Sequence, residues 1–413
     1  MLDNRALKKR VLVVCQHFYP ESFRINDLVD GLTEDGYSVD VLCGIPNYPS
    51  GEWNKGYGYL SSRRENYHGA TIYRSLEIRR KGNTALRIFL NYTSWPLTAS
   101  FKALFLRKNY DVVFCYNTSP VLMILPAKIA AIVNRCPLVT YVLDIWPENL
   151  YTVLHIESRF FRHIAQAFSD WSYRLCDHLI ALSESLADNL RNRLNNAGRN
   201  YPITVLPQHC EQFYERKTFS SELRRDFGGE IVFLFAGSIT PAQDLKTVID
   251  AFDLASSALS TKPYLLILGD GMSRNEMECY AQHLKCHDYI RFYGKVPPEV
   301  VSDYFDISTA SITPFADYPE LELTVPAKVA SCMAASQPIL AVMRGEGARA
   351  IKESHCGLVS DPSDIGALAN NMVSIATMPE EERASMASNG FEYYSKHYSR
   401  RRSLDIIEQV LYS

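Results

Sequence analysis

Lys328 stands at a place in the sequence that indicates binding of an anion. The stretch TVPAKVASCMAASQPILAV (residues 324–342) has the pattern of a short helix that Pro338 ends, followed by a strand-like apolar run. Pro326 suits the first helical turn, because its missing N–H would have no partner there. Lys328 then lies in the first turn, where a cation opposes the helix dipole unless an anion lies beside it. We predict that Lys328 neutralises such an anion, and an ordinary surface lysine is the alternative.

Three more loops in the second half of the chain carry residues suited to a nucleotide. Each follows a strand-like apolar run and contains glycines, which let a ligand approach the backbone. The runs are FLFAGSITPAQDL, LLILGDGM and MRGEGARAI. Their candidate residues are Gly237, Ser238, Gln243, Asp244, Gly269, Asp270, Gly271, Arg344, Glu346 and Gly347. A carboxylate such as that of Glu346 can accept hydrogen bonds from sugar hydroxyls, and an ordinary first-turn acid is the alternative.

Two familiar nucleotide-binding motifs are absent from the sequence. No GxxxxGK[ST] motif is present, which excludes a P-loop. No GxGxxG follows the first strand-like run, which argues against a dinucleotide-binding domain. Residues 269–271 also fit a plain strand-to-helix turn, so the prediction depends on four loops that follow one another in one half of the chain.

Short apolar strands alternate with helical segments along the whole chain. This alternation predicts parallel sheets of the doubly wound type. The pattern runs twice and changes over near residues 200–230, which predicts an α/β protein with two Rossmann-like domains facing a cleft. We assign residues 1–205 to the first domain and 206–392 to the second. Ligands of such sheets bind at the carboxyl ends of the strands.

The composition is that of a globular protein. The chain has 413 residues, of which 47% are hydrophobic, and its net charge of −3 argues against a nucleic-acid partner. The 10 cysteines are scattered without a CxxC pair, so we expect reduced and mostly buried thiols in a cytosolic protein. The first apolar run, VLVVC, is too short for a signal peptide. No apolar run reaches the length of about 18 residues that a membrane-spanning helix needs.

The sequence resembles glycosyltransferase family 4, whose members have the GT-B fold. The motifs of the second half are GSITPAQDL, LGDG, FYGKVP, SITP, VPAKVASCMAASQPILA and GEGARAI. Those of the first half are QHFYPESFRINDLVDGL, IPNYPSG and YVLDIWPENL. The resemblance spans nearly the whole chain. The phrases QHFYPE, IPNYPSG and DIWPE look like the subgroup that includes N-acetyl-L-fucosamine transferases of bacterial O-antigen and capsule assembly.

The resemblance implies two substrates. A nucleotide-sugar donor, with uridine as the favoured base, is expected in the second domain, and an undecaprenyl-diphosphate-linked sugar acceptor in the first. Lys328 and its helix N-terminus are expected to meet the donor diphosphate and stabilise the leaving group. No cofactor and no metal is expected, in keeping with GT-B enzymes generally, and no Asp-x-Asp pair stands at a predicted strand end.

The resemblance also extends the site and the architecture. It adds four donor-binding residues, Gly294, Lys295, Val296 and Ala348. It further implies that a kinked helix over about residues 393–413 packs back on the first domain.

The chain departs from the broad family at the positions that hold the sugar. Many members carry two glutamates with seven residues between them, and here those positions are Leu323 and Ser331. The usual basic residue after the first donor glycine is Ser238, and the usual lysine–glycine pair is Gln243-Asp244. The subgroup shares the Gln-Asp pair. We therefore take Glu322 and Glu346 as candidates for holding the sugar, and we prefer Glu346.

The first half carries the candidates for the reacting face. Asp144 ends a strand-like run, and we expect it to orient hydroxyls or stabilise an oxocarbenium-like transition state, with a helix cap as the alternative. We expect the configuration of the sugar to be retained. Retaining members of the family lack a clear nucleophile, so we do not assign that role to Asp144. Glu21 is a candidate base for the acceptor hydroxyl. The candidate acceptor-binding residues are Tyr19, Arg24, Asn26, Asn47, Tyr48 and Trp146.

Basic and aromatic side chains interleave over residues 79–108. They are Arg79, Arg80, Lys81, Arg87, Lys102, Arg107 and Lys108, with Phe89, Tyr92, Trp95, Phe101 and Phe105. We predict that this surface rests on anionic lipid, which places the protein peripherally at the inner face of the cytoplasmic membrane. A pair of amphipathic helices that covers the sheet is the alternative.

Two other functions fit the same sequence. A nucleotide-sugar epimerase of this fold would convert the donor without an acceptor. A non-catalytic partner subunit would bind the donor and leave it intact, a possibility that follows from the two missing glutamates.

Overall fold

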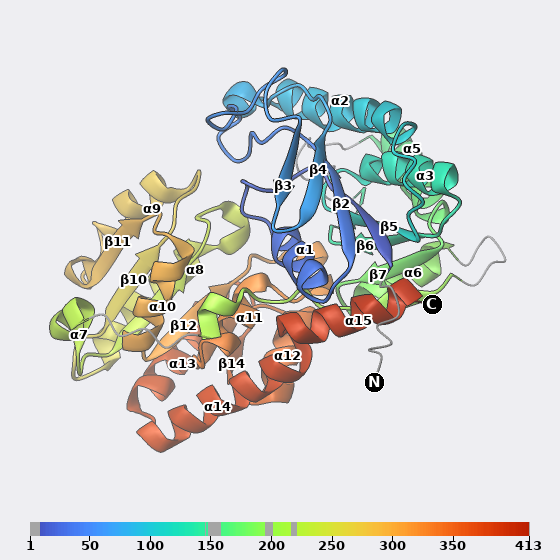
Figure 1. Cartoon of the computed structure of the whole chain (residues 1–413). Helices are drawn as coiled ribbons and strands as arrows, with labels where there is room; N and C mark the ends of the chain where they lie inside the picture. Colours follow the sequence, from blue (N-terminus) through green and yellow to red (C-terminus); the bar gives the residue numbers. More distant parts are fainter. Residues whose placement is uncertain (1–8, 145, 148–157, 195–200, 216–220, 413) are drawn as a thin grey trace, which may run out of the picture. The chain divides into compact units, whose positions relative to one another are not determined.

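The computed structural model describes residues 9–144, 146–147, 158–194, 201–215 and 221–412. The chain divides into two compact units, each built around its own sheet (Figure 1). The first unit comprises the described residues up to Leu206 together with those from Leu404 on, and the second is Pro207–Ser403. The second unit thus reaches beyond residue 392, where we had predicted its end.

The sheet of the first unit has its strands in the order β3-β4-β2-β1-β5-β6-β7-β8. Neighbouring strands are parallel except for β3, which pairs antiparallel with β4 at the edge and was not expected from the sequence. The strands are β1 (Arg10–Val14), β2 (Ser38–Cys43), β3 (Arg64–Tyr67), β4 (Ala70–Arg74), β5 (Val112–Asn117), β6 (Leu138–Val142), β7 (His178–Ala181) and β8 (Ile203–Val205).

Helices connect the parallel strands of the first unit, as such crossovers require. They are α1 (Arg24–Glu34), α2 (Ala85–Ala103), α3 (Ile124–Asn134), α5 (Arg159–Arg174) and α6 (Glu184–Leu194), with the short 3₁₀ turns η1 (Lys81–Asn83) and η2 (Val121–Met123). The last helix, α15 (Arg400–Tyr412), packs on α1. A Cβ added to Gly31 of α1 would lie 2.4 Å from Cδ1 of Leu404, so glycine lets the two helices approach.

The second unit has a six-stranded parallel sheet in the order β11-β10-β9-β12-β13-β14. The strands are β9 (Val232–Ala236), β10 (Tyr264–Leu268), β11 (Ile290–Gly294), β12 (Ala310–Pro314), β13 (Ile339–Val342) and β14 (Gly357–Ser360). The helices are α7 (Ser221–Phe227), α8 (Leu245–Ala258), α9 (Arg274–Ala281), α10 (Pro298–Ile307), α11 (Ala327–Ala334), α12 (Gly345–Ser354), α13 (Ile365–Thr377) and α14 (Glu380–His397). Short 3₁₀ turns are η4 (Gln212–Glu215), η5 (Pro241–Gln243), η6 (His287–Tyr289) and η7 (Pro319–Leu323).

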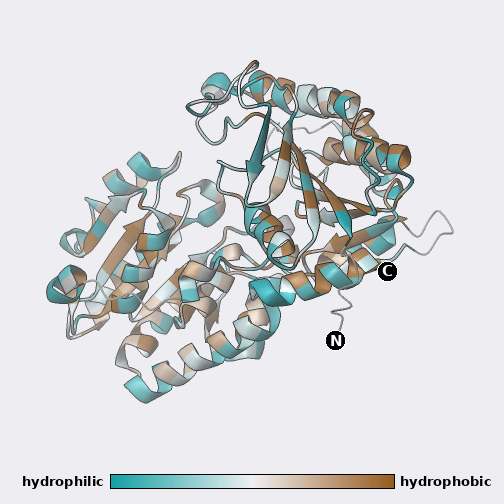
Figure 2. Cartoon of the chain, in the orientation of Figure 1, coloured by the Kyte–Doolittle hydropathy of each residue, from teal (hydrophilic) through white to brown (hydrophobic). Residues whose placement is uncertain are grey.

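Both faces of the second sheet are buried. Leu234 and Leu266 belong to one apolar cluster, while their strand neighbours Phe233 and Leu265 belong to the other. Successive residues of a strand point to opposite faces, so a strand buried on both sides is apolar throughout. Figure 2 shows the strands of the second unit mostly in the hydrophobic colour. This confirms the predicted doubly wound α/β class.

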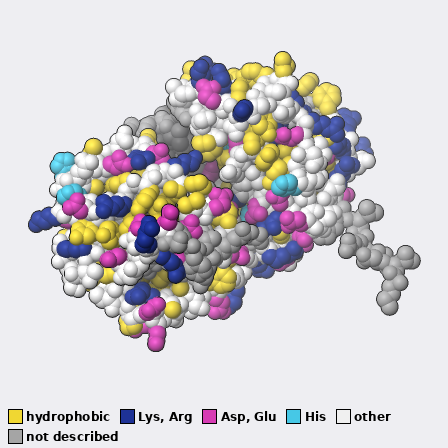
Figure 3. Space-filling model, turned by 60° about the vertical axis from the view of Figure 1, so that its left-hand side comes forward, with side chains coloured by type: hydrophobic (Ala, Val, Ile, Leu, Met, Phe, Trp, Pro, Cys, Tyr) yellow, Lys and Arg dark blue, Asp and Glu magenta, His cyan; other side chains and the backbone are white. Residues whose placement is uncertain are grey.

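The kinked helix predicted over about residues 393–413 is two helices, the end of α14 and the separate helix α15. The residues from Leu404 on group with the first unit, while those up to Ser403 group with the second. The ten cysteines are free thiols; Cys279 is exposed, Cys136 is half-buried and the other eight are buried. Figure 3 shows acidic and basic side chains interspersed over the face that it presents. In the part of the chain that the structure describes, no helix is long and apolar enough to cross a membrane.

Candidate active site

Three predicted glycines meet where β9, β10 and β11 end. The amide of Gly237 donates to Leu268 O at 2.8 Å, and that of Gly269 donates to Gly294 O at 2.8 Å. Gly237 and Gly269 have φ values of +153° and +144°. A Cβ on Gly269 would lie 1.7 Å from Gly237 O. Glycine is therefore required on both loops, because the Gly237 backbone lies where a Gly269 Cβ would be and the Lys328 side chain lies where a Gly237 Cβ would be.

Lys328 lies against the loop that follows β9. Its Nζ donates a hydrogen bond to Oε1 of Gln243 and lies 4.3 Å from the centroid of the Phe235 ring. A Cβ on Gly237 would lie 2.2 Å from Lys328 Cε. The structure thus brings together three of the predicted donor residues, Lys328, Gln243 and Gly237.

The electrostatics of Lys328 favour an anion beside it. Pro326 is the N-cap of α11, so Lys328 is the second helical residue and lies next to the free N–H groups of the first turn. Burial lowers the pKa of Lys328 to about 8. No described carboxylate forms an ion pair with its ammonium group. A bound anion would supply the missing countercharge for both the lysine and the helix dipole.

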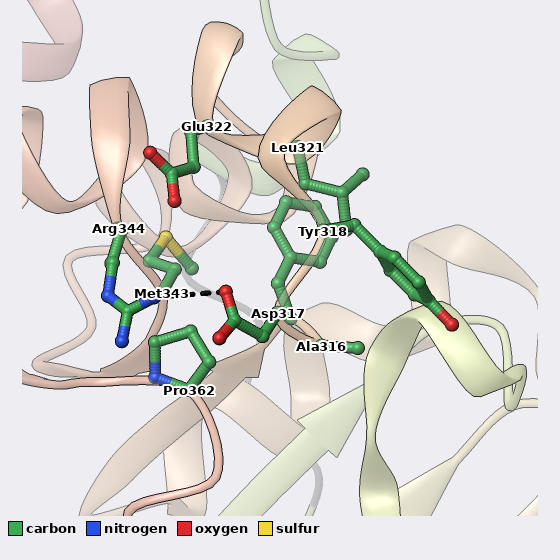
Figure 4. Close-up of a pocket in the computed structure, with 9 residues that line it drawn as sticks. Ala316, Asp317, Tyr318, Leu321, Glu322, Met343, Arg344 and Pro362 are labelled. Carbon is green, nitrogen blue, oxygen red and sulfur yellow. Dashed lines mark hydrogen bonds and ion pairs between the residues drawn. The ribbon is translucent and has the colours of Figure 1, made fainter. Parts of the chain in front are cut away.

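A second group of predicted residues lines a pocket beyond β12 and β13 (Figure 4). Arg344 donates from Nη1 to Asp317 Oδ1 at 2.9 Å and lies 3.5 Å from Asp361. Glu322 comes from η7 on the opposite wall. The lining residues are Phe315, Ala316, Asp317, Tyr318, Leu321, Glu322, Met343, Arg344 and Pro362. Glu322 and Arg344 therefore share a pocket, as a common role in donor binding requires.

Backbone contacts join this pocket to the Lys328 side of the unit. The amide of Ala316 donates to Ala242 O at 3.0 Å, which links the loops after β12 and β9. A Cβ on Gly345 (φ +70°) would lie 2.1 Å from Glu322 O, and one on Gly347 would lie 2.8 Å from Pro326 Cδ. The glycines at the start of α12 thus let it pack directly against η7 and the start of α11.

The remaining donor candidates have local partners. Glu346 is buried and forms an ion pair with Arg349 of the same helix, and Ala348 is buried nearby. Asp244 accepts a hydrogen bond from Thr247 at 2.7 Å, and Asp270 accepts one from Gly271 N at 2.8 Å. These carboxylates stabilise turns in this structure. Ser238 and Lys295 are exposed, and Val296 is half-buried beyond β11.

In the first unit, Asp144 follows β6 and is held by a serine that the sequence analysis missed. Ser119 Oγ donates to Asp144 Oδ2 at 2.7 Å and accepts from Trp146 Nε1 at 3.0 Å. Burial raises the pKa of Asp144, although the bond from Ser119 opposes the shift. Trp146, a candidate acceptor-binding residue, is buried, and its carbonyl accepts from Ser169 at 2.9 Å, so it packs this loop. The segment in which Asp144 would cap a helix lies outside the described residues.

Glu21 joins two loops of the first unit. Its Oε2 lies 2.8 Å from His17 Nδ1, and its Oε1 accepts from the amides of Asn47 and Tyr48 at 2.6 Å each. Asn26 ties the same loop to α1 by donating to Glu21 O at 2.8 Å. Both carboxylate oxygens of the buried Glu21 thus have partners, which favours a positioning role over the predicted role as a base.

The other acceptor candidates surround these loops. Tyr19 and Tyr48 expose their rings, and Arg24 is the first residue of α1. The Tyr48 ring contacts His17 and Phe23, with centroids 5.4 Å apart in both pairs.

A buried polar network lies under these loops and was not found from the sequence. Glu77 Oε2 accepts from Gln16 at 2.7 Å and from Asn91 at 3.1 Å, while its Oε1 accepts from Asn47 at 2.9 Å. Burial raises the pKa of Glu77 to about 8. Gln16 and Glu77 follow β1 and β4, so their place after parallel strands was the signal available in the sequence.

Two residues of the basic–aromatic segment are not on the surface. Arg80 is buried, and it donates to Asn91 Oδ1 at 3.0 Å and to His17 Nε2 at 3.2 Å. Trp95 is fully buried in α2. Their assignment to a lipid-facing surface was wrong, because basic and aromatic residues in alternation do not show which face of a helix packs on the sheet.

Comparison with known proteins supports the interpretation of both units. Residues 23–207 match the model described as Glycosyltransferase Family 4, and residues 218–393 match that of Glycosyl transferases group 1. The chain is 24% identical over 296 residues to a protein described as probable glycosyltransferase WbjE of Pseudomonas aeruginosa. The match covers 69% of this chain and 72% of that protein.

Solved structures share the fold across nearly the whole chain. Sucrose-phosphate synthase from Thermosynechococcus elongatus superposes with a TM-score of 0.72 at 14% identity, covering 98% of each chain. Alr3699/HepE of Anabaena, solved with UDP, gives a TM-score of 0.67 at 15% identity over 97% of this chain and 99% of its own. WaaG, a glycosyltransferase involved in lipopolysaccharide biosynthesis, gives 0.66 at 14% identity over 96% and 99%.

Two parallel-sheet α/β units of this kind define the GT-B class of enzymes. The two family models together cover most of both units. The chain is a glycosyltransferase of the GT-B type, with a Glycosyltransferase Family 4 domain in its first half and a group 1 domain in its second.

Proposed function

We propose that this enzyme moves a sugar from a UDP-linked donor to a lipid-linked oligosaccharide during assembly of a bacterial surface polysaccharide. Solved structures of the same fold hold UDP or UDP-glucose, which supports the donor class. WbjE is described as a probable glycosyltransferase of Pseudomonas aeruginosa, and WaaG as a glycosyltransferase involved in lipopolysaccharide biosynthesis. Both similarities support a role in the assembly of a surface polysaccharide. The sequence motifs favour N-acetyl-L-fucosamine or a related amino or deoxy sugar. The acceptor is an undecaprenyl-diphosphate-linked sugar at the inner face of the cytoplasmic membrane.

The observation that carries this proposal is the ammonium group of Lys328 at the start of α11, which donates to Gln243 and forms no ion pair with a carboxylate of the described residues. Cleavage of the bond between sugar and diphosphate leaves the bonding electrons on the nucleotide, so negative charge builds on the diphosphate. An ammonium group and the N–H groups of a helix N-terminus stabilise that charge in the transition state. The missing side chain of Gly237 leaves room for Lys328, and Gln243 holds the Lys328 ammonium group in position.

In this proposal the leaving group needs no divalent cation. Across the described ranges, no group of three or more His, Cys, Asp or Glu side chains could hold a metal ion. The charge that magnesium would neutralise falls instead to Lys328 and α11. Activity is therefore expected to survive removal of divalent cations with EDTA, and loss of activity that Mg²⁺ restores would contradict this part of the proposal.

Asp144 is proposed to act on the sugar rather than on the leaving group. As the anomeric bond breaks, positive charge develops on the ring, and a carboxylate stabilises it. Asp144, held by Ser119, is the candidate. The acceptor hydroxyl then attacks the anomeric carbon from the face that the diphosphate leaves, and it passes its proton to the oxygen of the departing diphosphate, which has taken the bonding electrons. We propose that the configuration is retained, without a covalent intermediate on a named residue.

The test is a reaction of the purified enzyme with a panel of UDP-sugars, with and without a polyprenyl-diphosphate-linked sugar, followed by mass spectrometry. Extension of the acceptor supports the proposal. Conversion of the donor without acceptor would instead indicate an epimerase, and donor bound but never turned over would indicate a partner subunit.

A matched pair of variants assigns the site. We expect Lys328→Ala to abolish transfer, because it removes the cation that lies against the Gly237 loop. Lys352→Ala removes an exposed lysine of the neighbouring helix α12 and should leave activity unchanged. Equal activity of both variants would overturn the assignment of Lys328.

A further inference from the structure

Helix α5 exposes the side that an amphipathic helix normally buries. Its buried residues are the small or polar Ser169 and Ser172 together with Tyr173. Its large apolar side chains are between 37% and 70% exposed: Phe160, Phe161, Ile164, Phe168 and Trp171. They recur at helical spacing and form one stripe. A helix of this kind buries its apolar stripe against its own sheet, so an exposed stripe calls for a partner outside the chain.

Two neighbouring helices extend this apolar surface. Helix α3 contacts both α2 and α5, and all three lie along the same part of the first unit (Figure 1). Ile132 of α3 is exposed. In and just after α2, large apolar side chains are between 42% and 71% exposed: Leu86, Phe89, Leu97, Phe101, Leu104 and Phe105. We call the exposed side of α2, α3 and α5 the three-helix face.

The charge of the three helices has one sign. Their only acidic residue is Asp170, whose carboxylate accepts from Arg193 at 2.8 Å and is thereby neutralised. Their basic residues are Arg87, Lys102, Lys128, Arg159, Arg162 and Arg174. Lys128 forms an ion pair with Asp177 at 3.6 Å, and Lys102 and Arg174 are half-buried. The exposed basic side chains are those of Arg87, Arg159 and Arg162. The whole chain, by contrast, has a net charge of −3. The three helices are therefore a local region of positive charge in an acidic protein.

We infer that the three-helix face docks on a bilayer surface that contains anionic lipid, with the aromatic stripe of α5 inserted at the boundary of headgroups and acyl chains. Apolar side chains flanked by Arg and Lys are the pattern of helices that lie in a membrane interface. Basic residues near the surface gain from anionic headgroups. Pairing of two copies of this face would instead bring basic residues against basic residues, which opposes association.

This inference goes beyond the predicted segment 79–108, because its main inserting element is α5. It concerns binding to lipid and does not depend on which sugar is transferred. Vesicle binding is measured without donor or acceptor, so its failure and a failure of the proposed transfer are distinguishable.

The first experiment is flotation of the full-length protein with two kinds of vesicle, pure phosphatidylcholine and an equimolar mixture with phosphatidylglycerol. We expect co-flotation with the anionic vesicles that high salt weakens. Phe160→Ser/Phe161→Ser should reduce that binding by about tenfold or more, because two of the apolar rings of the stripe are lost. The control variant Leu254→Ser/Met272→Ser removes exposed apolar residues of the second unit and should bind as wild type.

The charge of the face is tested by Arg87→Gln/Arg159→Gln, which should weaken binding to anionic vesicles and leave the weak binding to phosphatidylcholine unchanged. Circular dichroism melting checks that each variant is folded. Equal flotation of wild type and the Phe160/Phe161 variant would overturn the proposal. Sedimentation that shows a dimer dissociated by the same variant would overturn it too, since the occupant would then be a second copy.

Trp171 gives a readout of insertion depth. Trp95 and Trp146 are buried and Trp53 is half-buried, so Trp53→Phe makes Trp171 the exposed indole of the chain. On anionic vesicles its emission should shift to the blue, and brominated acyl chains should quench it. Emission unchanged by vesicles that bind the protein would overturn the insertion of α5.

Discussion

The amine of Lys328 donates a hydrogen bond to the side-chain carbonyl of Gln243, so the start of α11 is joined to the loop that follows β9. Because the amide of Gln243 is uncharged, this bond leaves the charge of Lys328 without a countercharge among the described residues. Without a countercharge, burial lowers the pKa of Lys328 to about 8. The binding of a donor diphosphate should therefore depend on pH near this value.

UDP binding should weaken as the pH rises through about 8. Below that value Lys328 is charged and attracts the diphosphate, and above it the amine is neutral. Bound UDP stabilises the proton on Lys328, so the pKa rises and binding takes up protons near pH 8. Calorimetry in buffers of different ionisation heat measures this uptake directly. Lys328→Arg should bind UDP with little dependence on pH, whereas a flat profile for the wild type would contradict the assignment.

Gln243→Glu should impair donor binding. The new carboxylate would form an ion pair with Lys328, raise its pKa and repel the diphosphate. We expect the Kd for UDP to rise by about tenfold, which corresponds to about 1.4 kcal/mol. Gln282→Glu adds the same charge at an exposed position after α9 and is the control. If both variants bind UDP equally well, Gln243 does not lie beside the diphosphate.

Gly237→Ala should damage the site and the fold together. Its φ of +153° disfavours alanine, and the new Cβ would collide with Lys328 Cε. We expect a loss of about 1–3 kcal/mol in the free energy of unfolding and a displaced Lys328. The control is Gly366→Ala, whose Cβ would meet only Asp364 Oδ1 at 3.7 Å. Thermal melts and UDP titration of both variants test this, and wild-type behaviour of Gly237→Ala would refute it.

Asp144→Asn tests whether this side chain acts in catalysis. The amide can keep the contact with Ser119 but cannot stabilise positive charge on the sugar. We expect kcat to fall by about a hundredfold with little change in the KM for donor. The raised pKa of Asp144 also predicts that wild-type activity is lost on the acid side at a higher pH than for an ordinary aspartate. Ser119→Ala is the companion variant, and an Asn variant with full kcat would leave Asp144 a purely structural role.

The donor loops could be predicted from the sequence because each lies directly after an apolar strand. In a parallel sheet these loops meet at one edge, so Gly237, Gly269 and Lys328 converge even though they are far apart in the chain. The contacts of Arg344 with Asp317 and Asp361 depend on loop geometry, which no local pattern specifies. Arg80 illustrates the same limit, since its charge suggested the surface while the fold turned it inward.

The network around Glu77 also depends on contacts between distant segments, and it has a measurable effect on stability. The folded pKa of Glu77 is raised to about 8, so the folded state binds its proton more tightly than the unfolded state. The first unit should therefore lose stability as the pH rises from that of an ordinary glutamate toward 8. In Glu77→Gln, which carries no charge, this decline should disappear.

All four tryptophans lie in the first unit, at positions 53, 95, 146 and 171, so their fluorescence follows the unfolding of that unit alone. Urea denaturation at several pH values between 5 and 8 compares wild type with Glu77→Gln. Gln16 Oε1 has no hydrogen-bond partner among the described residues, so the amide of Gln16 can rotate to accept a hydrogen bond from the amide that the substitution introduces. Glu34→Gln, at the exposed end of α1, is the control and should keep the wild-type slope. Identical slopes for all three proteins would show that Glu77 is ionised in the folded state, and the network would then have to hold a buried charge.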